Sequence, residues 1–131
     1  MGSAWKDSNN GWLFYLVLNS GSPTTTSLKA RQKLAGVWQA PVLLGTQGLE
    51  WYGATGLTGT SSDRSKVAVL FGTNVGLKAY HLDLTGWHET LVDPAYYNNS
   101  RWYRIGFDSA NKLRILFRSQ SDYSSYIAVH E

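Results

Sequence analysis

Two tryptophans stand beside polar side chains of a kind that binds the hydroxyl groups of sugars. Trp38 is followed by Gln39. Trp87 is followed by His88 and Glu89. Sugar recognition combines an aromatic ring, which covers the apolar C–H face, with donors and acceptors that converge on the hydroxyls. Carbohydrate binding is therefore one chemistry that these residue types and spacings offer.

Aromatic residues make up 14% of the chain, and several of them adjoin groups that can bind a ligand. Trp51 and Trp102 are each followed by a tyrosine. Arg114 is an isolated cation in the apolar run 113–117, so it either faces solvent or is paired in a cleft. The full set of candidate ligand-binding residues comprises Trp51, Tyr52, Tyr80, Trp87, Glu89, Trp102 and Arg114.

The same rings have a second interpretation as packing residues. A large ring at a repeated position more often fills a core than binds a ligand. This applies to Trp38 and Trp87, which recur at equivalent positions of an internal repeat. For Trp51 and Trp102 ligand binding and packing both stay open.

The sequence contains few of the motifs that catalysis or metal binding requires. The chain has no cysteine, no Gly-x-Ser-x-Gly elbow and no phosphate-binding loop. His81 and His88 lack a third ligand at the spacing of a metal site, so we expect no metal and no other cofactor. Asp83, Glu89 and Asp93 fall on different strands or turns and give no carboxylate pair for glycoside hydrolysis. We therefore predict a protein without enzymatic activity.

Composition narrows the class of protein further. The chain has 131 residues, enough for one domain, and a net charge of +3. Its basic residues are scattered rather than clustered, so we expect no binding to nucleic acid. No run approaches the roughly 18 apolar residues of a membrane span. We expect a soluble protein, and the sequence is compatible with both a cytoplasmic and a secreted one.

An internal repeat organises the chain. The segment 28–30 (Leu-Lys-Ala) is followed by Trp38, and 77–79 (Leu-Lys-Ala) is followed by Trp87 with the same ten-residue step from leucine to tryptophan. The two copies lie 49 residues apart, a period typical of propellers, solenoids and arrays. We predict a single domain of about two and two-thirds repeats, approximately 1–46, 47–97 and 98–131.

The elements that must position these residues are predicted to be strands. Apolar or alternating runs of strand length are bounded by Gly, Asn, Asp and Ser, and no window keeps a helical apolar stripe. The run 13–18 predicts a strand buried on both faces, and 72–76 and 108–111 predict hairpin turns. Pro41 predicts an edge strand or an irregular end. Four strands per repeat indicate an all-β protein built from propeller-like antiparallel blades, with a β-sandwich or barrel as the alternative.

The repeat also resembles a known family. The run 113–117 (Leu-Arg-Ile-Leu-Phe), a polar turn, a second strand and a downstream tryptophan look like a blade of the fungal fucose-binding lectins, which are six-bladed propellers. The resemblance implies that sugars bind between blades, held by an arginine near the start of the second strand and a glutamate on the third. Arg114 stands where that arginine would be. Ala68 takes its place in the second copy, and 124–126 (Ser-Ser-Tyr) take that of the glutamate.

These features together predict a lectin whose partners are glycans or glycoconjugates. The sugar would lie in clefts between blades, stacked on Trp or Tyr and held by polar hydrogen bonds. Fewer than three blades leave sheet faces and edges unpaired, so we expect a homo-oligomer that completes the ring, the other route being that the chain is a piece of a longer protein. The alternative is a non-catalytic protein-interaction or assembly module whose rings form the subunit contacts.

Overall fold

The chain folds into three antiparallel sheets, here called sheets A, B and C. The computed structural model describes residues 2–21, 24–48, 55–73, 76–93, 103–118 and 125–129. Within these ranges every regular element is a strand, and none of the three sheets closes into a barrel, which confirms the all-β, antiparallel prediction. These ranges contain no helix that is long and apolar enough to cross a membrane.

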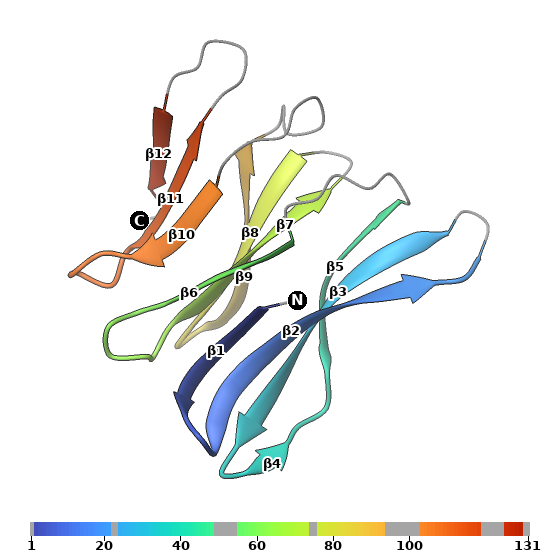
Figure 1. The fold of residues 1–131 in the computed structure, drawn as a ribbon, viewed down its shortest axis with the longest axis horizontal. Coiled ribbons are helices and arrows are strands. Elements are labelled where there is room, and N and C mark those ends of the chain that lie inside the picture. Colours follow the sequence, from blue (N-terminus) through green and yellow to red (C-terminus); the bar gives the residue numbers. More distant parts are fainter. Residues whose placement is uncertain are drawn as a thin grey trace.

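Sheet A forms the N-terminal part of the molecule, drawn in blue to cyan in Figure 1. β2 lies between β1 and β3, and both β4 and β5 pair with the far edge of β3. Pro41 falls between β4 and β5, where its missing N–H interrupts the edge, as predicted. The strands are β1 (Gly2–Asp7), β2 (Asn10–Asn19), β3 (Thr25–Leu34), β4 (Val37–Trp38) and β5 (Val42–Gly48).

Sheets B and C repeat this up-and-down order. In each sheet every strand pairs with the next one along the chain. The two predicted hairpins are confirmed, because the pairing runs up to Thr73 and Gly76 in sheet B and to Phe107 and Leu113 in sheet C. The strands are β6 (Thr55–Thr60), β7 (Val67–Thr73), β8 (Gly76–Asp83), β9 (Gly86–Asp93), β10 (Tyr103–Phe107), β11 (Leu113–Arg118) and β12 (Ser125–Val129).

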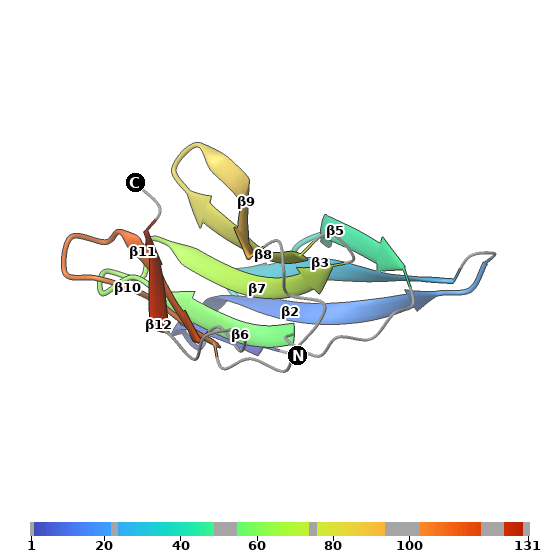
Figure 2. The ribbon, with the colours of Figure 1, turned by 90° about the horizontal axis from the view of Figure 1, so that it is seen from above.

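Sheet B lies between sheets A and C, and a core fills each junction (Figures 1 and 2). Residues of β7 alternate between the two cores, so the whole strand is buried. The core between A and B contains Phe14, Leu28, Val69, Phe71 and Tyr80. The core between B and C contains Leu70, Leu77, Tyr103, Leu113 and Ile115.

The Leu-Lys-Ala repeat has a structural counterpart. Leu28 and Ala30 of β3 face sheet B, and Leu77 and Ala79 of β8 face sheet C. Each pair therefore packs against the sheet that follows in the chain. The tryptophans differ: Trp87 packs against the core between A and B, whereas Trp38 is 38% exposed.

The prediction that the run 13–18 is buried on both faces is wrong. Phe14 is buried, but Leu13 and Tyr15, which point to the opposite face of the strand, are only partly buried. The physical reason is that, in the described part of the chain, a sheet covers only one face of sheet A. By strand alternation the opposite face carries seven large or basic side chains, and we call it the outer face of sheet A: Trp5, Leu13, Tyr15, Lys29, Arg31, Lys33 and Trp38.

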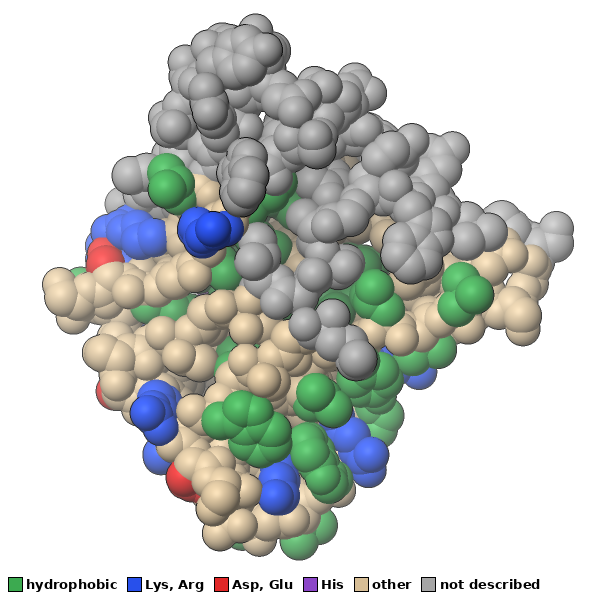
Figure 3. Space-filling view, in the orientation of Figure 1, with side chains coloured by type: hydrophobic (Ala, Val, Ile, Leu, Met, Phe, Trp, Pro, Cys, Tyr) green, Lys and Arg blue, Asp and Glu red, His purple; other side chains and the backbone are tan. Residues whose placement is uncertain are grey.

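The outer face of sheet A mixes apolar groups with cations. The Trp5 and Trp38 rings meet edge to face with centroids 6.0 Å apart, and the Arg31 guanidinium lies 5.8 Å from the Trp38 ring. Figure 3 shows apolar side chains interspersed with Lys and Arg over the part of the molecule where Figure 1 draws sheet A.

Candidate functional site

A cleft of about 330 Å³ opens between sheets A and B. It lies where the β1–β2 turn of sheet A approaches the β6–β7 connection, residues 61–66, of sheet B. This volume is at the lower end of the range for small-molecule sites, so the cleft suits a small ligand.

One side of the cleft is apolar and contains a fixed tryptophan. Trp12, Leu34 and Leu82 line this side. The Trp12 ring meets the ring of Trp87 edge to face, with centroids 5.2 Å apart and planes at 87°. Such aromatic pairs stabilise one orientation of both rings. The cleft therefore has a preorganised aromatic wall, the group that an apolar sugar face requires.

Polar side chains of both signs line the rest of the cleft. They come from the β1–β2 turn, from β3 and from residues 61–66, and comprise Lys6, Asp7, Asn10, Gln32, Arg64 and Lys66. Asp7 accepts hydrogen bonds from the Asn9 backbone amide at 2.8 Å and from the Asn10 side chain at 2.9 Å. These bonds lower the pKa of Asp7, so the carboxylate is charged at neutral pH and able to accept from a hydroxyl.

Arg64 connects the two walls of the cleft. Its guanidinium donates to the backbone carbonyl of Lys6 across the sheet junction. Its backbone φ of 58° lies in the left-handed region, which is uncommon for a residue other than glycine. A second bridge, from the Thr58 hydroxyl to the Ser3 carbonyl at 3.1 Å, joins the same two sheets. The cleft walls are thus tied to each other by hydrogen bonds.

Asp63 holds the backbone of residues 61–66. Its carboxylate accepts from the Ser61 hydroxyl at 2.6 Å, the Ser65 amide at 3.0 Å and the Ser65 hydroxyl at 2.8 Å. The bond from Ser61, followed by those from Ser65, lowers the pKa of Asp63 to about 2. This local network is an Asx turn, and it fixes the backbone position from which the Arg64 side chain extends toward sheet A.

The sequence-predicted site residues lie in three places. Trp51, Tyr52 and Trp102 fall outside the described residues. Tyr80, Trp87 and Glu89 lie on the face of sheet B that is turned toward sheet A. Arg114 belongs to sheet C, and by alternation with the buried Leu113 and Ile115 it points away from sheet B.

Tyr80 and Glu89 form a local network beside the core. Tyr80 is only 3% exposed, and burial followed by the neighbouring Glu89 carboxylate raises the pKa of its hydroxyl. Glu89 pairs with the Lys78 ammonium, whose hydrogen bond lowers the pKa of Glu89. Arg114 pairs with Asp108 in the same way on sheet C.

None of the four described candidates lines the cleft between A and B. Trp87 comes nearest, through its contact with Trp12. The residues that sequence reasoning missed are Trp12, Asp7 and Arg64. The segment 7–10 (Asp-Ser-Asn-Asn) predicts a polar turn just before Trp12, so the sequence marks Asp7 and Trp12 as neighbours. Arg64 lies far away in the chain, in a connection of a different sheet, and no local pattern connects it with them.

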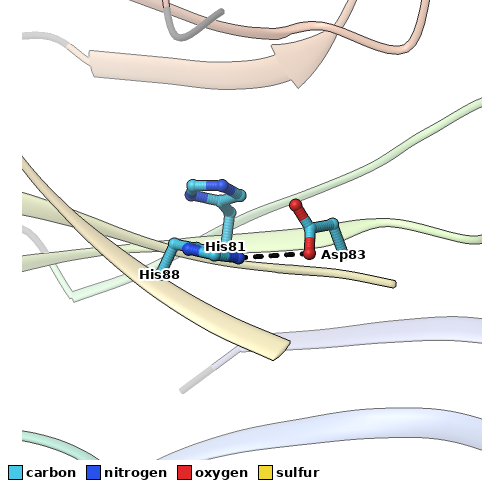
Figure 4. A group of neighbouring side chains, drawn as sticks. All are labelled: His81, Asp83 and His88. Carbon is cyan, nitrogen blue, oxygen red and sulfur yellow. Dashed lines mark hydrogen bonds and ion pairs between the residues drawn. The ribbon is translucent and has the colours of Figure 1, made fainter. Parts of the chain in front are cut away.

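Three side chains at the junction of sheets B and C form a second polar cluster. His81, Asp83 and His88 each offer one potential ligand atom, and these atoms lie within 4.8 Å of one another (Figure 4). Asp83 supplies a third potential ligand atom, which the sequence spacing did not indicate. The hairpin between β8 and β9 brings the three side chains together. It places His88 opposite His81, and Asp83 follows His81 by two residues on the same strand.

Comparisons with known proteins give no relative for this chain. No family model, curated protein or solved structure matches it. The site itself combines an aromatic wall, a charged acceptor and several donors around a small cleft.

Proposed function

We propose that this protein is a non-enzymatic carbohydrate-binding protein that holds a small sugar in the cleft between sheets A and B. The observation that carries the proposal is the placement of the Trp12 wall beside the Asp7 carboxylate and the Arg64 guanidinium in one cleft. A sugar offers an apolar face to the ring and hydroxyls to the charged groups.

The mixture of charges favours a neutral ligand over a charged one. Lys6 and Arg64 line the same cleft as Asp7, so the site has both donors and an acceptor. A hydroxyl group uses both, because it donates one hydrogen bond and accepts others. The volume of about 330 Å³ fits the end of a glycan rather than a long chain.

We also propose that the three sheets are propeller blades and that a homo-oligomer completes the ring. The up-and-down order of each sheet and the face-to-face stacking of B between A and C support this assembly. The outer face of sheet A, with Trp5 and Trp38 exposed, is the surface that a neighbouring blade would cover.

A glycan array with the intact chain tests the lectin proposal. The strongest glycan is then titrated against Trp12→Ala, which removes the wall, and Gln32→Ala, which removes one polar group with little effect on packing. We expect Gln32→Ala to weaken binding by roughly 3- to 10-fold, the equivalent of one hydrogen bond.

Arg114→Ala is the matched control, because it removes a polar side chain far from the cleft on sheet C. Its affinity should equal that of the wild type. Absence of binding to every glycan would overturn the proposal. Loss of binding in Arg114→Ala, with the glycan affinity of Gln32→Ala unchanged, would indicate that the sugar binds at sheet C and not in this cleft.

The rival function, a protein-interaction or assembly module, is favoured by one specific observation. The outer face of sheet A places the exposed Trp5 and Trp38 rings beside Arg31, and aromatic residues with arginine are typical of interface centres. Trp38→Ser should reduce self-association under the lectin proposal and leave the affinity for sugar per chain intact. If Trp38→Ser assembles less well and neither the wild type nor this variant binds a glycan, the result would favour the assembly module.

A further inference from the structure

The cluster of His81, Asp83 and His88 lies on one face of sheet B. His81 of β8 stands opposite His88 of β9 in the strand register, and Asp83 follows His81 by two residues, so all three share a face. That face is the one turned toward sheet C, because Leu77 and Ala79 of the same strand pack there. The three side chains are thus placed by the β8–β9 hairpin itself (Figure 4).

The geometry of the cluster is close to that of a metal site. The two imidazole rings are stacked at 5.0 Å with planes at 22°, and the His88 Nε2 atom lies 3.1 Å from an Asp83 carboxylate oxygen. Ligands at about 2.0–2.1 Å from a tetrahedral zinc ion are roughly 3.3 Å from one another. The potential ligand atoms, which lie within 4.8 Å of one another, need to move by no more than about 1.5 Å, which side-chain rotation supplies.

The aspartate of the cluster is held in place by the hairpin turn. Its Oδ1 atom accepts from the Thr85 amide at 2.7 Å and from the Thr85 hydroxyl at 2.7 Å. Hydrogen-bonded carboxylates of this kind are the ones that metal sites use, because their orientation is fixed before the ion arrives.

Access to the cluster is open on one side. The His88 and Asp83 side chains are 42% and 31% exposed, whereas His81 is buried. The internal repeat relates this cluster to the cleft between A and B. The residues 49 positions before His81 and Asp83 are Gln32 and Leu34. Both of these line the cleft between A and B. The cluster therefore occupies, at the junction of B and C, the place that the cleft wall occupies one sheet earlier.

We propose that His81, Asp83 and His88 bind one divalent transition-metal ion of the zinc class and leave a coordination position open. Two imidazoles and one carboxylate suit Zn²⁺, Ni²⁺, Co²⁺ or Cu²⁺. Mg²⁺ and Ca²⁺ prefer oxygen ligands throughout, so they fit this set poorly. Three protein ligands leave room for a water molecule or for a group of an incoming ligand.

Titration of the metal-free chain with Zn²⁺ by calorimetry tests this proposal, with Mg²⁺ as the comparison ion. We expect one Zn²⁺ per chain and no measurable Mg²⁺ binding. His88→Ala changes an exposed side chain and Asp83→Asn preserves the turn, so both variants should fold. Each should weaken Zn²⁺ binding by at least about tenfold. Co²⁺ should give the visible absorption of a low-coordinate site in the wild type alone.

Two controls make the outcome specific. Asp108→Asn changes an aspartate that holds the equivalent kind of turn in sheet C, away from any described histidine, and should bind Zn²⁺ like the wild type. His130→Ala removes the remaining histidine of the chain and should also leave binding unchanged. Failure of the wild type to bind Zn²⁺, or binding that is undiminished in His88→Ala, would overturn the proposal.

Discussion

At the scale of single residues, the two repeated tryptophans have different roles. Trp87 packs against Trp12 and Phe14 with ring centroids at 5.2 and 6.1 Å, whereas Trp38 contacts Trp5 on the outer face of sheet A. One ring therefore belongs to the core between sheets and the other to a surface. Their shared position in the repeat gave no means of separating these roles.

Trp87→Ala should behave as a core truncation. We expect the free energy of unfolding to fall by about 2–4 kcal/mol, slightly less than for a fully buried tryptophan because Trp87 is half-buried. Urea denaturation measures this loss. Trp38→Ala is the matched comparison and should cost about 0.5–1.5 kcal/mol, the range for one aromatic pair. Equal losses in the two variants would contradict the distinction.

Asp63 should make the stability of the protein depend on acid pH. Its pKa in the folded state is about 2, below the roughly 3.9 of an unfolded aspartate. The ionised form therefore favours the folded state above pH ~4, and this contribution disappears as the pH falls from about 4 to about 2. Melting temperatures of the wild type and Asp63→Asn, measured across this range, should converge at the acid end. A constant difference would show that Asp63 does not act through its charge.

At the scale of elements, the Tyr80 side chain of β8 reaches β5 of the neighbouring sheet and leaves no room for a Cβ atom at Gly45. A Cβ atom at Gly45 would lie 2.3 Å from the Tyr80 hydroxyl oxygen and 2.9 Å from the ring carbon that carries it. Gly45→Ala should therefore lower the free energy of unfolding by about 1–3 kcal/mol through overpacking.

Tyr80→Phe should relieve part of that clash, because it removes the nearer atom. Chemical denaturation of both single variants and the double variant gives the coupling between them. We expect the double variant to be more stable than the sum of the two changes predicts. Strict additivity would mean that the Tyr80 ring does not contact Gly45 in solution.

The sequence allowed the elements to be predicted better than the site. Strand runs, the hairpins and the Leu28 and Leu77 repeat follow from local patterns, which a strand period of two makes visible. Trp12 and Arg64 line one cleft but are far apart in the chain, and only the stacking of two sheets joins them. The proximity of Asp83 to the two histidines could not be predicted from spacing along the chain, because strand pairing brings these side chains together.

At the scale of the whole molecule, the two outward faces carry the same sign of charge. The outer face of sheet A has Lys29, Arg31 and Lys33, and the corresponding face of sheet C has Arg104 and Arg114, of which Arg114 is paired with Asp108. A ring closed by stacking sheet A of one chain on sheet C of another must overcome this repulsion.

Self-association should therefore become stronger as the salt concentration rises. Added salt screens the repulsion, since the Debye length falls from about 10 Å at 0.1 M to about 3 Å at 1 M. Light scattering across this range measures the mean mass of the particles. A single species near the 14.6 kDa chain mass at every salt concentration would contradict assembly by this route.

The burial of β7 on both faces has a consequence for the order in which the native state opens. Sheet A or sheet C can detach and expose one core, but β7 becomes accessible to solvent only after both cores have been lost. In amide hydrogen exchange the β7 amides should be the slowest, limited by global unfolding, and those of β1, at the edge of sheet A, should exchange through local fraying. The middle sheet would then set the lifetime of the native state, and the outer two would respond first to heat, denaturant or proteolysis.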